Sequence, residues 1–126
     1  MDKTLSQRHE REFAEIIPGG AQVLASGAKL DKHDVRTATQ GMWKFRYELK
    51  CTQKKGFRFT AEAWKKLKDY IYGRSSEERP AYALRFYGED TDRISSTKVL
   101  ADIVIVDLND WIELLEELET LRGEGK

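Results

Sequence analysis

Residues 43–52 read WKFRYELKCT, and this stretch decides the fold because its apolar and polar residues alternate strictly. Successive side chains of a β-strand point to opposite faces of the sheet, so every second residue shares a face. The pattern therefore predicts a half-buried strand with one apolar row in the core and one polar row outside it. The apolar row is Trp43, Phe45, Tyr47, Leu49 and Cys51, and the polar row is Lys44, Arg46, Glu48, Lys50 and Thr52.

The polar row contains the motif Glu-x-Lys at Glu48 and Lys50, whose side chains are expected on the same face, roughly 6.5–7 Å apart along the strand. Asp34 lies upstream of it. Two carboxylates with water can hold Mg²⁺, joined by the backbone carbonyl of Leu49 if the strand is an edge or bulges there, and an ammonium can orient an attacking water. The pattern favours a metal-dependent phosphodiesterase site. The alternative is an ordinary surface ion pair, worth less than about 1 kcal/mol.

The rest of the chain predicts an α/β fold with a central sheet between helices, formed by one domain over residues 1–126. The first helix, over residues 4–17, is ended by Pro18, and His9 is expected on its exposed side. Two later helices are expected to start at the capping residues Thr60 and Asp107, the former ending near Gly73. The expected strands are a short piece at Val23–Leu24 and the segments 34–36, 43–52, 57–59, 81–87 and 99–106, the last of them buried.

The C-terminal helix has an apolar stripe that includes Leu115, Leu118 and Leu121. Such a stripe is typical of packing against the protein's own core, and it also suits a partner-binding or dimer helix. Trp64 and Trp111 are expected to be packing residues on their helices.

The charges are balanced overall and unevenly distributed. The chain of 126 residues has 22 basic and 22 acidic residues, yet 12 basic and 4 acidic residues lie in 29–68, against 2 basic and 8 acidic in 101–126. A basic segment favours phosphate binding, with a solvated surface as the alternative. No apolar run is long enough to span a bilayer and Cys51 is alone, so the sequence favours a cytoplasmic protein without disulfides or cysteine-bound zinc.

Several short segments together resemble the archaeal-type Holliday junction resolvases and their phage relatives, in the PD-(D/E)xK nuclease superfamily. They occur in the family's order over about residues 7–87, and His33 replaces the proline of the motif name. The segments are a helix with an acid, Ser26-Gly27-Ala28, Asp34-Val35, Tyr47-Glu48-Leu49-Lys50-Cys51-Thr52, Lys54-Lys55 and a strand opened by Pro80.

The resemblance implies a restriction-endonuclease-like core and Mg²⁺-dependent cleavage of branched DNA by a homodimer, with Mn²⁺ as a substitute ion, in a bacterial, archaeal or phage-infected cell. It implies that Asp34 and Glu48 bind the metal and that Lys50 is catalytic. The helix acid would be Glu10, with Glu12 as the second choice. Residues expected to contact DNA are Ser26, Gly27, Lys29, Lys32, Arg36, Lys54 and Lys55.

Two other functions fit the same residues. One is a nuclease that nicks or cuts duplex or flapped DNA, because branch selectivity depends on dimer geometry and not on the motif. The other is a DNA-binding module without catalysis, which is disfavoured because Asp34, Glu48 and Lys50 are all present.

Overall fold

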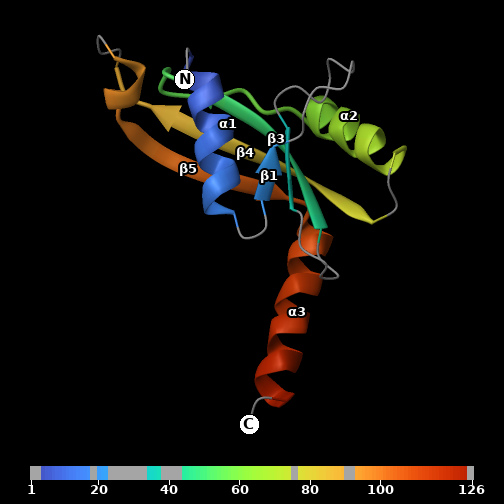
Figure 1. The fold of residues 1–126 in the computed structure, drawn as a ribbon. Helices are drawn as coiled ribbons and strands as arrows, with labels where there is room; N and C mark the ends of the chain where they lie inside the picture. The colour runs from blue at the N-terminus through green and yellow to red at the C-terminus, as the bar shows by residue number, and fades with distance from the viewer. Residues whose placement is uncertain are drawn as a thin grey trace.

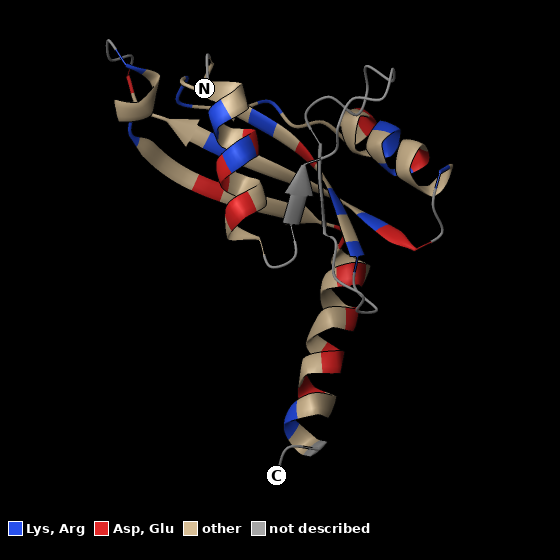
Figure 2. Cartoon of the chain, in the orientation of Figure 1, with Lys and Arg blue, Asp and Glu red and all other residues tan. Residues whose placement is uncertain are grey.

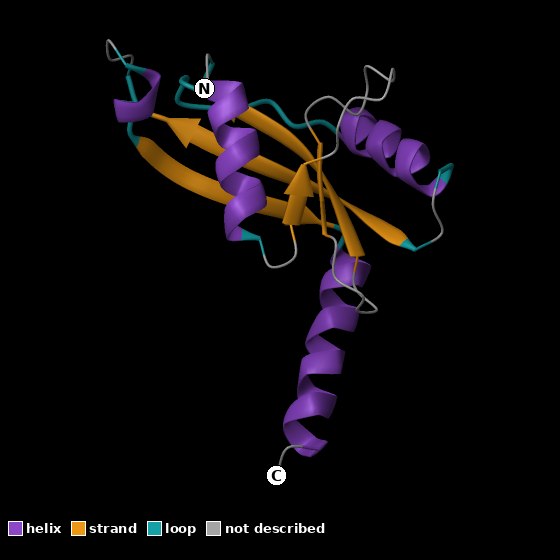
Figure 3. Cartoon of the chain, viewed as in Figure 1, coloured by secondary structure: helices purple, strands orange, loops and turns teal. Residues whose placement is uncertain are grey.

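The computed structural model describes residues 4–17, 20–22, 34–37, 44–74, 77–89 and 93–124, with the side chains of 20–22, 34–37 and 124 left aside. Both helices and strands occur along the chain (Figures 1 and 3). Their order is α1 (Leu5–Ile16), β1 (Gly20–Gln22), β2 (Asp34–Thr37), β3 (Lys44–Thr52), α2 (Ala61–Tyr72), β4 (Glu78–Tyr87), η2 (Ile94–Ser96), β5 (Val99–Val106) and α3 (Leu108–Glu124).

The strands form one mixed sheet in the order β1-β2-β3-β4-β5. β3 and β4 are parallel and joined through α2, and their register runs from Lys44 opposite Glu78 to Thr52 opposite Phe86. The other neighbouring strands pair antiparallel. The expected α/β class with a mixed sheet flanked by helices is thus confirmed.

Helices cover both faces of the central strands, as parallel pairs require. On one face, Phe13 of α1 packs on the apolar row of β3, where its ring centroid lies 4.9 Å from that of Tyr47. On the other face, Leu67 and Ile71 of α2 pack against Tyr82 of β4. The two faces of β3 therefore lie beneath different helices, and the polar row shares its face with α2.

The helix starts follow the sequence signals. The hydroxyl of Thr60 accepts a hydrogen bond from the backbone N–H of Ala63, and Thr4 caps α1 in the same way. The carboxylate of Asp107 accepts a hydrogen bond from the backbone N–H of Asn109 at the start of α3. These caps satisfy N–H groups that a helix leaves unpaired in its first turn.

Three strand predictions need correction. Residues 57–59 are not a strand, because Phe59 instead packs edge-on against Tyr82, at 5.0 Å between ring centroids, beside the start of α2. β4 begins at Glu78, so Pro80 lies inside it and does not open it. β5 is half-exposed and not buried, since it ends the described sheet. The strand β1 was not expected, and Val23–Leu24 lies outside the described residues.

α3 projects away from the sheet as an isolated helix, with the C-terminus far from the other elements (Figure 1). Its first turns are held by Arg79, whose Nη1 lies 2.6 Å from Asp110 Oδ1 and 3.0 Å from Glu113 Oε2. The apolar side of α3 is exposed, so its stripe does not pack on the protein's own core as expected, and Trp111 is half-exposed. Within the described residues, no helix has the length and apolar character that crossing a membrane requires.

Candidate functional site

The antiparallel pairing of β2 with β3 places Asp34 directly opposite Glu48. Directly opposite residues of such a pair have Cβ atoms about 4.5–5.5 Å apart and share a face of the sheet. The described pairing with β2 ends at Glu48, and residues 49–52 of β3 pair with β4 alone among the described strands. The two acids singled out in the sequence therefore occupy opposite backbone positions, at the point beyond which no described strand pairs with this side of β3.

Glu48 and Lys50 lie on the same face of β3, as the alternation predicts. The ammonium of Lys50 is 3.4 Å from Glu48 Oε1. The Glu48 side chain is one-quarter exposed and that of Lys50 nearly half exposed. Both groups are therefore held in place and still reachable from solvent.

A cavity of about 360 Å³ adjoins Glu48 between β3, β4 and α2. Tyr82 and Tyr70 contribute aromatic walls and Lys66 contributes an ammonium. Sequence reasoning offered Lys66 as a phosphate contact or a solvated surface residue, and it missed both tyrosines as site neighbours. The register of β3 with β4, which places Tyr82 beside Glu48, depends on the β3-α2-β4 connection and has no local sequence signal.

Tyr82 is fixed next to the Glu48 carboxylate. Its hydroxyl donates a hydrogen bond to the carbonyl of Ala63, at 3.3 Å. Burial raises the pKa of Tyr82, and the negative charge of Glu48 raises it further. The phenol therefore stays neutral at ordinary pH, and its hydroxyl can form hydrogen bonds at the wall of the cavity.

The two basic residues at the start of β3 are engaged within the protein. Arg46 is buried, with its guanidinium 5.3 Å from the centre of the Tyr70 ring. The ammonium of Lys44 lies 3.0 Å from Glu77 Oε2.

Two expected DNA-binding lysines, Lys54 and Lys55, are exposed in the turn that follows β3. The hydroxyl of Thr52 accepts a hydrogen bond from the backbone N–H of Lys54 and so shapes this turn. Lys and Arg segments occur along β3 and α2, whereas Asp and Glu segments recur along α3 (Figure 2). The basic surface at this end of β3 is thus separate from the acidic helix.

The helix that carries both candidate helix acids lies over the opposite face of β3, the face of Tyr47 and Leu49. Glu12 is bound there by Arg85, at 2.6 Å, and by Arg8, at 3.2 Å. Burial opposes ionisation of Glu12, yet the hydrogen bonds from Arg85 and Arg8 outweigh it and lower the pKa. Glu10 lies on the same helix at intermediate exposure, so the structure does not place a helix acid on the Glu48 face.

His9 is buried, not exposed as expected, and only 1% of it is accessible. Its ring lies edge-on to Phe13, at 6.0 Å between centroids, and its Nε2 has no hydrogen-bond partner among the described residues. Burial, reinforced by the charge of Arg85, lowers the pKa of His9 to about 4. His9 is therefore a neutral core residue.

Several predicted site residues fall where the structure gives little or no description. The backbone of Arg36 lies in β2 opposite Arg46. Residues that lie outside the described ranges are Ser26, Gly27, Lys29, Lys32 and His33.

Within the residues whose side chains are described, no three His, Cys, Asp or Glu side chains gather as a metal centre. Asp34 is outside that set, so the donor pair rests on backbone register. Two carboxylates with water and a substrate phosphate are the usual protein contribution to a Mg²⁺ site, and Asp34 with Glu48 fits that donor set. No family model, curated protein or solved structure matches the chain.

Proposed function

We propose that the chain is a Mg²⁺-dependent DNA endonuclease that hydrolyses phosphodiester bonds at branched DNA, with four-way junctions as its substrate. The observation that carries the proposal is the direct pairing of Asp34 with Glu48, where Glu48 lies two residues before Lys50 on the same face. The fold proposed for this site is a restriction-endonuclease-like core, and its place of action is the cytoplasm.

The donor set supports the proposed chemistry. Asp34 and Glu48 would hold Mg²⁺, or Mn²⁺ in its place, which neutralises charge on the phosphate and lowers the pKa of a bound water. The partial exposure of Glu48 leaves room for water and a phosphate oxygen beside it. The cavity of about 360 Å³ next to Glu48 gives the backbone of a nucleotide a place to approach.

Lys50 supports hydrolysis in particular over binding alone. Its ammonium is 3.4 Å from Glu48 Oε1, so it lies within reach of a water held by the same carboxylate and of a phosphate bound beside it. There it can orient the attacking water or stabilise the charge that develops on the phosphate. The water oxygen forms a bond to phosphorus and loses a proton to solvent, the phosphorus–oxygen bond to one nucleotide breaks, and the leaving oxygen takes a proton from solvent.

The basic surface supports a nucleic acid as the substrate. Lys54 and Lys55 are exposed directly after the strand that carries Glu48 and Lys50. Two lysines at the end of this strand can bind the phosphates that flank the one that is cut.

The test compares a labelled four-way junction with a linear duplex of the same length, each with Mg²⁺ and with EDTA. We expect the junction to be cut with Mg²⁺ only, and faster than the duplex. Cleavage that persists in EDTA would exclude the metal mechanism, and equal rates on the two DNAs would indicate a general nuclease. Junction binding without any cleavage in Mg²⁺ or Mn²⁺ would instead indicate a DNA-binding module.

A further inference from the structure

The exposed side of α3 is an extended apolar surface without a partner among the described residues. Six side chains of this helix are between 41% and 68% exposed. On a monomer, contiguous apolar patches of this kind are uncommon and mark interaction sites. The six are Leu108, Trp111, Ile112, Leu115, Leu118 and Leu121.

The spacing of these residues suits a second helix. Leu108, Trp111, Leu115 and Leu118 follow one another at alternating intervals of three and four, the repeat that forms a seam between two packed helices. Three of the carboxylates, Glu113, Glu116 and Glu117, lie on the rest of the helix surface. Two copies of α3 can therefore meet along the apolar seam without bringing those carboxylates together.

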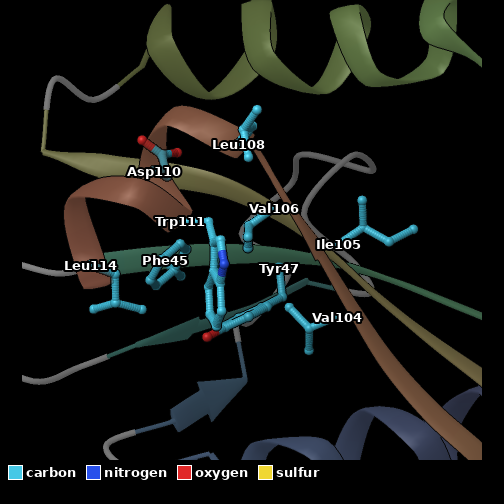
Figure 4. A pocket seen from close by; sticks show the side chains of 9 residues that line it. All are labelled: Phe45, Tyr47, Val104, Ile105, Val106, Leu108, Asp110, Trp111 and Leu114. Carbon is cyan, nitrogen blue, oxygen red and sulfur yellow. The ribbon is translucent and has the colours of Figure 1, made fainter. Parts of the chain in front are cut away.

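The apolar surface continues from α3 onto the sheet. A cavity of about 630 Å³ lies between the first turns of α3 and the strands β3 and β5 (Figure 4). Trp111 and Leu114 form its helical wall, and Phe45, Tyr47 and Val104 form its sheet wall. This cavity can receive bulky apolar side chains from a partner.

The exposed area is sufficient for a dimer. Six half-exposed side chains of this size offer roughly 100 Å² each, or about 600 Å² per chain. Two such surfaces bury about 1,200 Å², which is the lower end of stable protein interfaces, and the cavity adds to it.

The charges favour antiparallel pairing. The last turn of α3 carries Arg122, and its start carries Asp107 and Asp110. Asp110 is one of the residues that line this cavity. Its carboxylate oxygen Oδ2 is buried and has no hydrogen-bond partner among the described residues. An antiparallel copy brings its Arg122 beside this acidic first turn and also opposes the two helix dipoles.

We propose that α3 is the interface with a second copy of this chain, paired antiparallel with Leu115 near the two-fold axis. Leu118 and Leu121 of the second copy then lie against the first turns of α3 and the mouth of the cavity. This interface does not depend on the nuclease proposal, because the mass of the protein and its DNA cleavage are measured separately. A dimer without nuclease activity would support the interface alone, and a monomeric nuclease would support the nuclease proposal alone.

The first test measures the mass of the full chain by sedimentation velocity from about 1 to 100 μM. We expect about twice the 14.6 kDa mass of one chain. Leu115→Glu sets two carboxylates against each other at the axis and should weaken dimerisation at least 100-fold. Thr120→Glu adds the same charge on the far side of α3 and should leave the dimer intact. Circular dichroism checks that both variants fold.

A monomer at every concentration would overturn the proposal, and so would equal dissociation by both variants. The second test sets the orientation through oxidation of single-cysteine additions. Leu115→Cys should form a cross-linked dimer because its own copy lies across the axis, whereas Arg122→Cys should not. Cross-linking through position 122 would overturn the antiparallel arrangement, and the unaltered chain controls for Cys51.

Discussion

The ammonium of Lys50 lies 3.4 Å from the carboxylate of Glu48, across two steps of a single strand. An ion pair this exposed adds little to stability, because solvent screens it and the long side chains lose entropy. Its significance is positional, since it holds a cation beside the carboxylate that faces Asp34 in the sheet register.

Removing this cation should impair cleavage far more than folding or DNA binding. We expect Lys50→Ala to lower the cleavage rate about 10²- to 10³-fold, the usual effect of losing one group that stabilises transition-state charge. The rate is measured in single-turnover assays on a labelled junction, and DNA affinity in parallel. Lys44→Ala is the matched control, because Lys44 lies on the same strand and face but pairs with Glu77. Equal losses in both variants would remove Lys50 from the mechanism.

The lysines after β3 should bind DNA through phosphates and not through bases. Lys54→Ala and Lys55→Ala should each reduce the slope of log affinity against log salt by about 1, with similar effects on unrelated sequences. Arg11→Ala provides the comparison, since Arg11 is half-exposed on α1, over the opposite face of the sheet. An unchanged slope in the lysine variants would place the DNA elsewhere.

His9 should make the protein lose stability in mild acid. Burial lowers its pKa to about 4 from an ordinary value near 6.5. Between these values the folded state binds fewer protons than the unfolded state, so the free energy of unfolding falls as pH falls through this window. The total contribution is about 3 kcal/mol, fully present above pH 6.5 and lost by about pH 4.

His9→Gln tests this assignment because its side chain is neutral throughout. Urea unfolding at several pH values should show a shallower decline between pH 6.5 and 4 in the variant than in the unaltered protein. Glu12, whose pKa is lowered by Arg85 and Arg8, gives a further loss as pH falls below its ordinary value of 4.5. Parallel declines in the two proteins would assign the acid sensitivity to other groups.

Arg85 should be one of the most sensitive positions for stability. Its guanidinium is buried and pairs with both oxygens of Asp102, at 2.7 and 3.0 Å, and with Glu12, at 2.6 Å. Arg85→Met removes the cation that pairs with Asp102 and one of the cations that pair with Glu12, and it should cost about 3 kcal/mol in chemical unfolding. Arg11→Met, at an exposed site of α1, should change stability by less than about 0.5 kcal/mol. A similar small loss for Arg85→Met would mean that Arg85 adds no net stability.

Local patterns predicted most of the elements correctly. The alternation over residues 43–52 gave the strand and its two faces, and Thr60 and Asp107 gave the helix starts, because these signals act within a few residues. The strand prediction for Phe57–Phe59 was wrong because a contact between residues far apart in sequence overrides the local preference. An aromatic pair favours a strand locally, yet Phe59 packs on Tyr82, which is remote in sequence.

The surroundings of the site depend on contacts that no local pattern encodes. Burial of His9 and Arg46 requires α1 and α2 to cover opposite faces of the sheet, and both side chains look like surface residues in sequence. The pairing of Asp34 with Glu48 likewise follows from strand register. The sequence motif identified both acids, but their direct opposition depends on how β2 docks along β3.

The end position of β5 has a consequence for solubility. A strand with an unpaired edge can recruit the same strand of another molecule and start aggregation, unless a charge interrupts it. The sequence of β5 is VLADIVIV, in which Asp102 is the one charged residue. We therefore expect Asp102, which Arg85 holds in place, to act as a gatekeeper against pairing of β5 with the same strand of another molecule.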